Sequence, residues 1–265
     1  MKNIQNLCKV SKKFNFNNSD PDESFGLEKE ILKTELNDLL AKLSEFQQKL
    51  YAEGRRSVLI VLQGTDTSGK DGVIRHVMRA FNPIGCRVAS FKTPNNEEIS
   101  HDFLWRIHKK IPPKGIIGVF NRSHYEDIIE VRVRKLLPKE TWIKRYRQIN
   151  EFERYLTEDN ITVIKFLLNI SKEEQYKRLM DRISDPTEKW KASSDDYEKR
   201  KKWDEYHRAY SDVVAESSTK YAPWYIIPSN KKWIRNWVIA KILVERLEKM
   251  NPKFPDVKID INIKM

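Results

Sequence analysis

The decisive stretch of this sequence is residues 57–72, SVLIVLQGTDTSGKDG. Its apolar run 58–62 predicts a buried strand. The apolar residues after position 72 have the spacing of a helix. Gly64, Gly69 and Lys70 lie between the two in a Gly-x4-Gly-Lys pattern. A strand, a glycine-rich turn and a helix in this order are typical of a phosphate-binding loop. Backbone N–H groups, the helix N-terminus and the lysine can then surround phosphate oxygens.

The loop departs from the usual P-loop, or Walker A, pattern in two places. Asp71 stands where a serine or threonine commonly holds Mg²⁺, and Asp66 adds a carboxylate inside the loop. The candidate phosphate-binding residues of this segment are Gly64, Thr65, Thr67, Ser68, Gly69, Lys70, Asp71 and Gly72.

Length and composition restrict the class of protein. At 265 residues the chain can hold one large α/β domain or two small ones. Charged residues make up 33% of it, the mean hydropathy is −0.69 and the longest apolar runs are of strand length, so we expect no membrane span. No apolar N-terminal segment of the signal-peptide type is visible. Two cysteines, Cys8 and Cys86, cannot form a disulfide framework or a zinc site, so a reduced, cytoplasmic setting fits best.

The net charge of +12 is unevenly distributed along the chain. Residues 106–147, called the basic block below, contain 12 Lys or Arg against 4 Asp or Glu. Such a block is either a solvated face or a surface for a polyanion such as nucleic acid, an anionic membrane or polyphosphate.

Strand-like and helix-like segments alternate along the chain. Apolar strands separated by helices predict a parallel sheet covered by helices on both faces, which is an α/β fold. No repeat or linker divides the chain, so we expect one domain over 28–250, an N-terminal arm at 1–27 and a tail at 251–265. The predicted strands are 58–63, 86–91, 116–120, 161–168 and 224–227. The predicted helices are 28–53, 70–81, 97–110, 124–133, 139–157, 171–184, 195–216 and 231–249.

Two segments stand outside this alternation. Helix 28–53 carries a wide apolar stripe, which could dock another subunit or pack on the chain's own sheet. The polar, turn-prone segment 185–194, DPTEKWKASS, joins two predicted helices. It is either a mobile flap that closes over phosphates or an ordinary surface loop.

A second candidate site, NRSHYED at 121–127, follows the third predicted strand. In an open parallel sheet, ligands bind beyond the C-terminal strand ends, where this segment and the phosphate loop both emerge. Asn121 and Arg122 are candidates for phosphate, since a guanidinium presents planar donors that fit its oxygens. Glu126 or Asp127 can hold Mg²⁺ directly or through water. The alternative is that the two acids only begin a helix, where acidic residues are favoured.

Four motifs that fall in order together resemble the polyphosphate kinase 2 family: GTDTSGKDG, the SFK-x-P turn at 90–94, HDFLWR at 101–106 and FNRSHYED. The resemblance covers the chain from residue 28 to residue 250. It implies a P-loop kinase-like fold with a helical lid over 171–216, and phosphoryl transfer between inorganic polyphosphate and nucleotides. The family's loop reads Gly-x-Asp-x-x-Gly-Lys, so Asp66 and the absent Ser/Thr are family traits.

The resemblance also implies roles for individual residues. Asp66, Glu126 and Asp127 are the carboxylates expected at a Mg²⁺ ion, with Mn²⁺ as an alternative metal. Lys70 and Arg122 are expected on phosphate. Two arginines before the flap are expected to close over the transferring phosphates, and the subunits are expected to form a homo-oligomer, a dimer or tetramer. The implied catalytic set is Asp66, Lys70, Arg122, Asp127, Arg178 and Arg182.

The types of residue in the two candidate sites also suit phosphoryl transfer when the family resemblance is set aside. An acceptor phosphate oxygen is already ionised near neutral pH, so it needs no strong general base. The obstacle is to bring two polyanions together, which requires dense cations and in-line positioning. The sequence supplies these cations and shows no catalytic His or Ser constellation.

Our first hypothesis is a Mg²⁺-dependent phosphotransferase that converts AMP or ADP reversibly into ADP or ATP with polyphosphate, with guanine nucleotides as alternative substrates. The nearest alternative is an NTP-dependent nucleotide or small-molecule kinase, against which the +12 charge argues mildly. A nucleic-acid-binding P-loop protein is the alternative of another class, but the basic block contains no recognisable RNA or DNA module. ATP formation from ADP and long-chain polyphosphate, set against a gel shift with single-stranded RNA, discriminates between these hypotheses.

Overall fold

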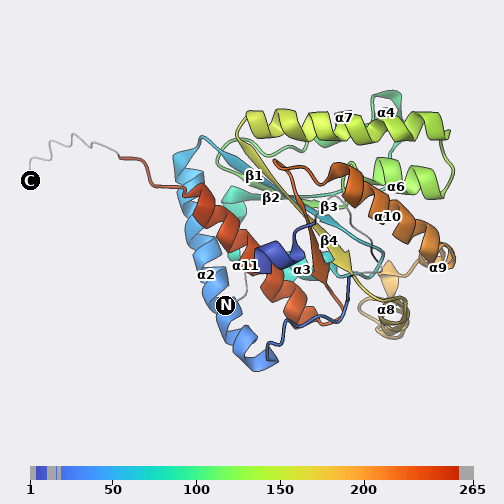
Figure 1. Cartoon of the computed structure of the whole chain (residues 1–265), viewed down its shortest axis with the longest axis horizontal. Coiled ribbons are helices and arrows are strands. Elements are labelled where there is room, and N and C mark those ends of the chain that lie inside the picture. The colour runs from blue at the N-terminus through green and yellow to red at the C-terminus, as the bar shows by residue number, and fades with distance from the viewer. Residues whose placement is uncertain (1–3, 11–15, 17–18, 257–265) are drawn as a thin grey trace, which may run out of the picture.

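The computed structural model describes residues 4–10, 16 and 19–256, and it consists of one parallel sheet between two layers of helices (Figure 1). The strands are β1 (Ser57–Gln63), β2 (Cys86–Ser90), β3 (Ile117–Asn121), β4 (Ile161–Asn169) and β5 (Trp224–Pro228). Their order in the sheet is β2-β3-β1-β4-β5, and each neighbouring pair is parallel. The predicted α/β fold is confirmed.

Helices connect the strands, but three of the predicted helices are interrupted. The helix predicted over 97–110 is two short helices, because His101 is extended and the Asp102 carboxylate accepts the Leu104 N–H at 2.9 Å. The helix predicted over 70–81 ends in a 3₁₀ turn at Met78–Ala80, and the one predicted over 195–216 breaks at Lys202. The helices are α1 (Ile4–Cys8), α2 (Lys29–Glu53), α3 (Lys70–His76), α4 (Asn96–Ser100), α5 (Trp105–His108), α6 (Glu126–Val133), α7 (Lys139–Glu158), α8 (Lys172–Ser184), α9 (Ser194–Lys201), α10 (Trp203–Ser217) and α11 (Lys232–Met250).

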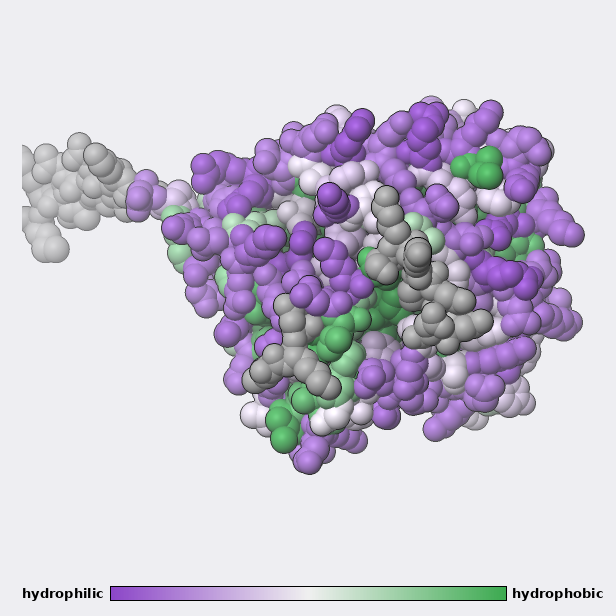
Figure 2. All heavy atoms as spheres, viewed as in Figure 1, coloured by the Kyte–Doolittle hydropathy of each residue, from purple (hydrophilic) through white to green (hydrophobic). Residues whose placement is uncertain are grey.

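The central strand β1 is buried on both faces, which explains its continuous apolar sequence. Successive side chains of a strand point to opposite faces, so Val58, Ile60 and Leu62 pack into one core cluster while Leu59 and Val61 pack into the other. The first cluster lies against α2, α3 and α11, and the second against α6, α7 and α10. Hydrophilic residues cover most of the face shown in Figure 2.

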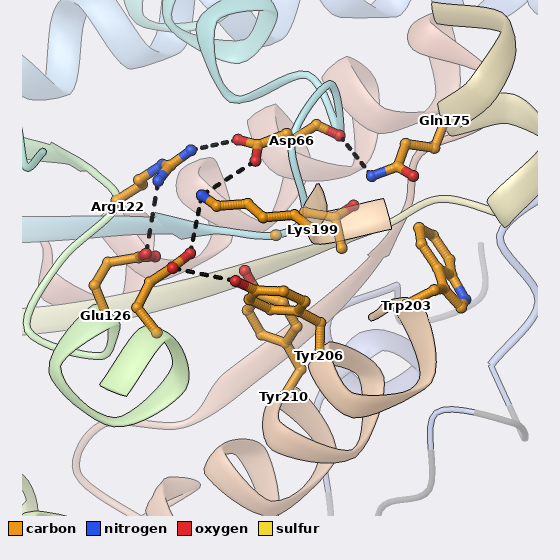
Figure 3. Close-up of a pocket in the computed structure, with 11 residues that line it drawn as sticks. Asp66, Arg122, Glu126, Gln175, Lys199, Trp203, Tyr206 and Tyr210 are labelled. Carbon is orange, nitrogen blue, oxygen red and sulfur yellow. Dashed lines mark hydrogen bonds and ion pairs between the residues drawn. The ribbon is translucent and has the colours of Figure 1, made fainter. Parts of the chain in front are cut away.

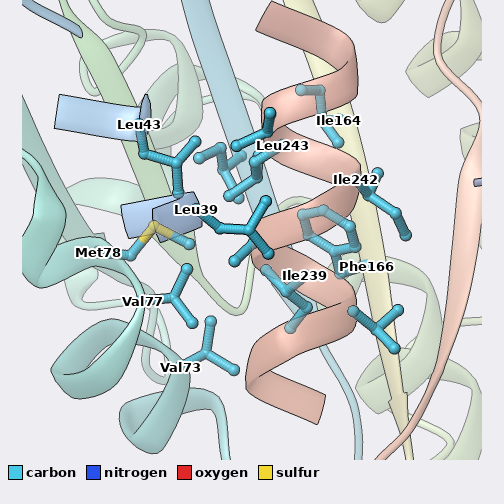
Figure 4. Packing of buried hydrophobic residues seen from close by; sticks show 14 of the residues in the cluster. Leu39, Leu43, Val73, Val77, Met78, Ile164, Phe166, Ile239, Ile242 and Leu243 are labelled. Atoms are coloured by element: carbon cyan, nitrogen blue, oxygen red, sulfur yellow. The ribbon is translucent and has the colours of Figure 1, made fainter. Parts of the chain in front are cut away.

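Helix α2 packs on the chain's own core. Its leucines Leu39 and Leu43 meet Ile239 and Leu243 of α11 above the sheet, with Met78 beside them (Figure 4). Gly54 ends the helix in a left-handed conformation, and its N–H donates to the Leu50 carbonyl. The apolar stripe of α2 is therefore part of the hydrophobic core of this subunit.

The N-terminal segment differs from the loosely packed arm expected at 1–27. In its described part, α1 packs against α11 and β5, and its Ile4 and Cys8 are buried in the core. Lys9 forms an antiparallel bridge with Tyr225 of β5. Residues 257–265, most of the expected tail, lie outside the described residues.

A buried ionic network joins the elements of the second layer. Lys165 of β4 donates from Nζ to Glu153 Oε2 at 2.5 Å, to Tyr125 Oη at 2.8 Å and to the Ser217 carbonyl at 2.8 Å. His124 Nε2 lies 3.2 Å from the other Glu153 oxygen. These residues come from the segment before α6, from α7, from β4 and from the end of α10, so the network fixes α6 and α10 relative to the sheet.

We expect Leu43→Ala to lower the free energy of unfolding by about 2–5 kcal/mol, because it removes a fully buried side chain and leaves a cavity between α2 and α11. Chemical denaturation followed by circular dichroism measures this loss. Leu7→Ala, at an exposed position, is the control and should change the value by less than about 0.5 kcal/mol. A loss of that small size for Leu43→Ala would contradict the position of α2 in the core.

Candidate functional site

The phosphate loop, residues 64–69, lies between the end of β1 and the start of α3, as the sequence predicts. Two of its glycines are required by geometry. Gly64 has φ +144°, and a Cβ there would lie 2.7 Å from Ser68 Oγ and 2.8 Å from the Leu168 carbonyl oxygen. Gly69 has φ +103°, and a Cβ there would lie 1.8 Å from Nη1 of Arg235. Other residues would strain the backbone and displace these neighbours.

Polar groups converge on the inside of the loop. Lys70 is buried and donates from Nζ to the carbonyls of Gly64 at 2.7 Å and Thr65 at 3.0 Å. The buried hydroxyls of Thr65, Thr67 and Ser68 have no hydrogen-bond partner among the described residues. Buried polar groups are nearly always paired, so three unpaired hydroxyls beside a lysine and a helix N-terminus fit a site for a phosphate group.

The second predicted segment comes to the same edge of the sheet. Arg122 follows β3 in a left-handed conformation with φ +61°, and its guanidinium pairs with the Asp66 carboxylate and lies 3.7 Å from Glu126. Asn121 donates from Nδ2 to Asp71 Oδ1 at 2.7 Å. Side chains from the two separate motifs are therefore in direct contact.

Asp66, Arg122 and Glu126 line a small pocket between the phosphate loop, α6 and the α8–α10 segment (Figure 3). Its volume of about 20 Å³ is of the order needed for one water molecule, so it must widen to accept a nucleotide. On the side of α10 its wall is aromatic. The lining residues are Gly64, Thr65, Asp66, Arg122, Glu126, Glu130, Gln175, Lys199, Trp203, Tyr206 and Tyr210.

Lys199 of α9 is a pocket residue that the sequence analysis missed. Its Nζ lies 3.3 Å from Asp66 and 2.9 Å from Glu130, in the centre of the carboxylates (Figure 3). The lysine stands in the run EKRKK, in which no spacing distinguishes it from its neighbours. Only the fold of α9 over the pocket identifies it.

The cations control the charge of the two pocket carboxylates. Burial alone would raise the pKa of Asp66, but Arg122 and Lys199 outweigh it and hold that pKa well below its usual range. At Glu126 burial dominates over Arg122, and its pKa is raised. Burial and the nearby Arg122 lower the pKa of Lys70 to about 8. Asp66 is therefore ionised at neutral pH while Lys70 is close to its titration range.

The comparisons with known proteins agree with this geometry. The sequence profile of the family described as Polyphosphate kinase 2 matches residues 26–255. A protein of Meiothermus ruber named AMP/ADP-polyphosphate phosphotransferase is 47% identical over 245 residues, which are 92% of each chain. An ADP-polyphosphate phosphotransferase of Rhodopseudomonas palustris is 41% identical, over 86% of this chain and 81% of the relative.

This chain belongs to the polyphosphate kinase 2 family. A crystal structure of polyphosphate kinase 2 from Arthrobacter aurescens TC1 superposes with a TM-score of 0.95 at 40% identity, covering 98% of this chain and 94% of that one. The resemblance inferred from the four motifs is thus confirmed, and so is the kinase-like fold.

One carboxylate implied by the polyphosphate kinase 2 resemblance lies outside the pocket. Asp127 is buried 3.2 Å from Arg106 Nη2 and 3.7 Å from Arg145 Nη1. Adjacent residues of a helix point in different directions, so Glu126 faces the pocket and Asp127 does not. Within the described ranges 4–10, 16 and 19–256, no cluster of three His, Cys, Asp or Glu side chains could hold a metal. Of the three expected carboxylates, Asp66 and Glu126 line the pocket, whereas Asp127 pairs with two arginines outside it.

The two arginines expected to close over the phosphates make other contacts in this structure. Arg178 donates to the carbonyls of Thr67 at 3.0 Å and Ser68 at 3.2 Å, and to those of Ser229 and Asn230. It supports the phosphate loop from outside. Arg182 lies 3.3 Å from Asp196 and so links α8 to α9. Neither lines the pocket.

The basic block is less available to a polyanion than its composition indicates. All six of its arginines make ion pairs; Arg134, for example, contacts Glu130 at 2.6 Å and Asp195 at 2.5 Å. One lysine, Lys109, lies 4.0 Å above the Trp105 ring. The block lysines without an ion pair to any described residue are Lys109, Lys110, Lys135, Lys139 and Lys144.

If Lys70 holds phosphate as the sequence predicts, we expect the affinity for ADP to fall as the pH rises above about 8, because the pKa of Lys70 is lowered to about 8 and its positive charge is then lost. ADP itself is fully ionised there, since its last phosphate pKa is about 6. Titration calorimetry in metal-free buffer should show a loss of up to about tenfold per pH unit. Lys70→Met should bind more weakly with no such pH dependence. An equally steep dependence in Lys70→Met would contradict this role of Lys70.

Proposed function

We propose that this protein transfers phosphoryl groups reversibly between inorganic polyphosphate and the nucleotides AMP and ADP. The observation that carries the proposal is the pocket itself: Asp66 in the phosphate loop meets Arg122 and Lys199 in a chain of the polyphosphate kinase 2 family. AMP and ADP are proposed as substrates because the names of the Meiothermus and Rhodopseudomonas relatives include them. Guanine nucleotides are included as alternative acceptors.

The chain's own residues can perform this transfer without a general base. An acceptor phosphate is already anionic, so the main barrier is repulsion between two polyanions. Lys70 at the loop and Arg122 opposite it supply fixed positive charge from two directions. In a pocket that excludes water, such preorganised charge lowers the energy of the transition state more than it would in solution. The same charges hold donor and acceptor in line.

We propose that Asp66 and Glu126 hold Mg²⁺, or Mn²⁺, when substrates bind. The donor set fits, because Mg²⁺ commonly takes one or two carboxylates together with substrate phosphates and water. Both carboxylates face the pocket and both lie beside Arg122. The ion would neutralise phosphate charge. Asp127, paired with Arg106, is not included in this set.

We also propose that α8–α10 act as a lid. The support is the position of Lys199, which reaches the pocket from α9, and the small pocket volume, which requires these helices to move before a nucleotide can enter. The connecting segment 185–194 is polar, and its Trp190 is 78% exposed.

We further propose that the protein is cytoplasmic and forms a homo-oligomer, either a dimer or a tetramer. Both cysteines are free thiols, which suits a reducing compartment. β2 is an edge strand, and the exposed Ile84 and Val88 at it offer an apolar surface for a second subunit. None of the helices in the described part of the chain has the length and apolar character needed to cross a bilayer.

We expect Lys70→Ala and Asp66→Asn each to lower the rate of ATP formation from ADP and polyphosphate by roughly 10²–10³ while the fold is kept. One variant removes the loop cation and the other the pocket carboxylate. Lys33→Ala, on the exposed surface of α2, is the control for loss of a lysine. Activity within about twofold of wild type in either folded variant would refute the site. Transfer from ATP but not from polyphosphate would favour the NTP-dependent kinase.

Closure of the proposed lid can be tested separately by limited proteolysis. Trypsin should cut the free enzyme in 185–194, after Lys189 or Lys191, and saturating ADP with polyphosphate should slow that cut because closure packs the segment. Replacing both lysines by glutamine should abolish the cut and so identify it. Equal cleavage rates with and without both ligands would rule out closure of this segment.

A further inference from the structure

A buried arginine lies directly behind the phosphate loop. Arg235, in the first turn of α11, is 2% exposed. Its guanidinium packs on the loop backbone so closely that a Cβ at Gly69 would lie 1.8 Å from Nη1, and a Cβ at Gly72 2.8 Å from Nη2. The charge therefore sits against the N-terminal end of α3, the end that faces a bound phosphate.

In the described part of the chain this charge has no acidic partner. Its Nε and Nη2 both donate to the neutral amide oxygen of Asn236, at 3.0 and 2.8 Å. No ion pair joins it to a carboxylate in the described residues, and its charged neighbour is a second cation, Arg178. Burial and Arg178 lower the pKa of Arg235 to about 10, so it remains charged at neutral pH.

An unpaired buried charge destabilises a folded protein unless something compensates it. Here the helix N-terminus of α3 adds partial positive charge, and Lys70 adds a full one on the other side of the loop. Among the described residues no carboxylate pairs with Arg235, so an anion bound from outside the chain would compensate its charge. The phosphate loop, with its three unpaired hydroxyls, is the nearest place for it.

We propose that Arg235 is a buried positioning residue of the phosphate loop: it destabilises the empty protein and strengthens phosphate binding through its charge, without touching the ligand. This inference rests on the proposed function only in that the loop binds phosphate. A purely structural role is the alternative, in which the flat guanidinium fills the space beside Gly69 and Gly72 and stabilises the fold by packing.

The two roles predict opposite effects of Arg235→Met, which keeps an extended side chain and removes the charge. If Arg235 is a positioning residue, the ligand-free Arg235→Met variant should melt at the wild-type temperature or higher. Its Kd for ADP and for pyrophosphate should be weaker by about tenfold or more. Arg235→Lys retains a charge, so its Kd should stay within about threefold of wild type.

Arg56→Met is the matched control, because Arg56 has an acidic partner, Glu53, at 2.5 Å and lies between α2 and β1, away from the phosphate loop. It should lower the melting temperature and leave both Kd values within about twofold. Melting is followed by differential scanning calorimetry without ligand, and binding by titration calorimetry.

An Arg235→Met variant that melts lower than wild type, or fails to fold, overturns the inference, and so does a Kd within about twofold of wild type. These results leave the proposed function intact as long as the wild-type protein binds ADP and transfers phosphate. A wild-type protein that binds neither ADP nor pyrophosphate would overturn both.

Discussion

The parallel pairing of β1 with β3 is the constraint on which the site depends. In this register Leu62 lies opposite Asn121, so the two strands end together at one edge of the sheet. Arg122 then continues the ladder through its N–H to the Leu62 carbonyl, and its guanidinium reaches Asp66 in the neighbouring loop. A one-residue slip would exchange the β1 side chains between the two differently packed core clusters, so packing in these clusters holds the register. The packing that stabilises the sheet thereby also aligns the phosphate chemistry.

Several charged side chains are buried at this edge of the sheet, and each depends on neighbouring groups that stabilise its charge. Asp66 is surrounded by Arg122 and Lys199, and Lys70 is held by carbonyls of the loop itself. Arg178 supports the same loop from outside, since it donates to the carbonyls of Thr67 and Ser68 and also to those of Ser229 and Asn230 after β5. The site is thus a cation-rich shell around a loop with one carboxylate, and side chains from α8 and α9, far along the chain, contact that loop.

Local sequence signals predicted the sheet, the phosphate loop and the contact between the two motifs, because each depends on neighbours along the chain or on a common sheet edge. The remaining features depend on tertiary contacts. Asp102 interrupts a helical pattern through one side-chain hydrogen bond, and the helix direction at Glu126 turns Asp127 away from the pocket. Lys199 and Arg178 look alike in the sequence as exposed helical cations, and only the fold assigns one to the pocket and the other to the loop backbone. The periodicity of a helical sequence does not predict which residue a charged side chain will contact in the folded protein.

The pocket between the phosphate loop and α10 has room for about one water molecule, and Trp203, Tyr206 and Tyr210 form its far wall. Water is itself an acceptor for phosphoryl groups, and it is far more abundant in the cell than any nucleotide. Because the pocket has so little room for water, few water molecules can compete with a nucleotide oxygen for a phosphoryl group held at the loop. The energy of the phosphoanhydride bond is then passed on to a new anhydride instead of being released as heat by hydrolysis.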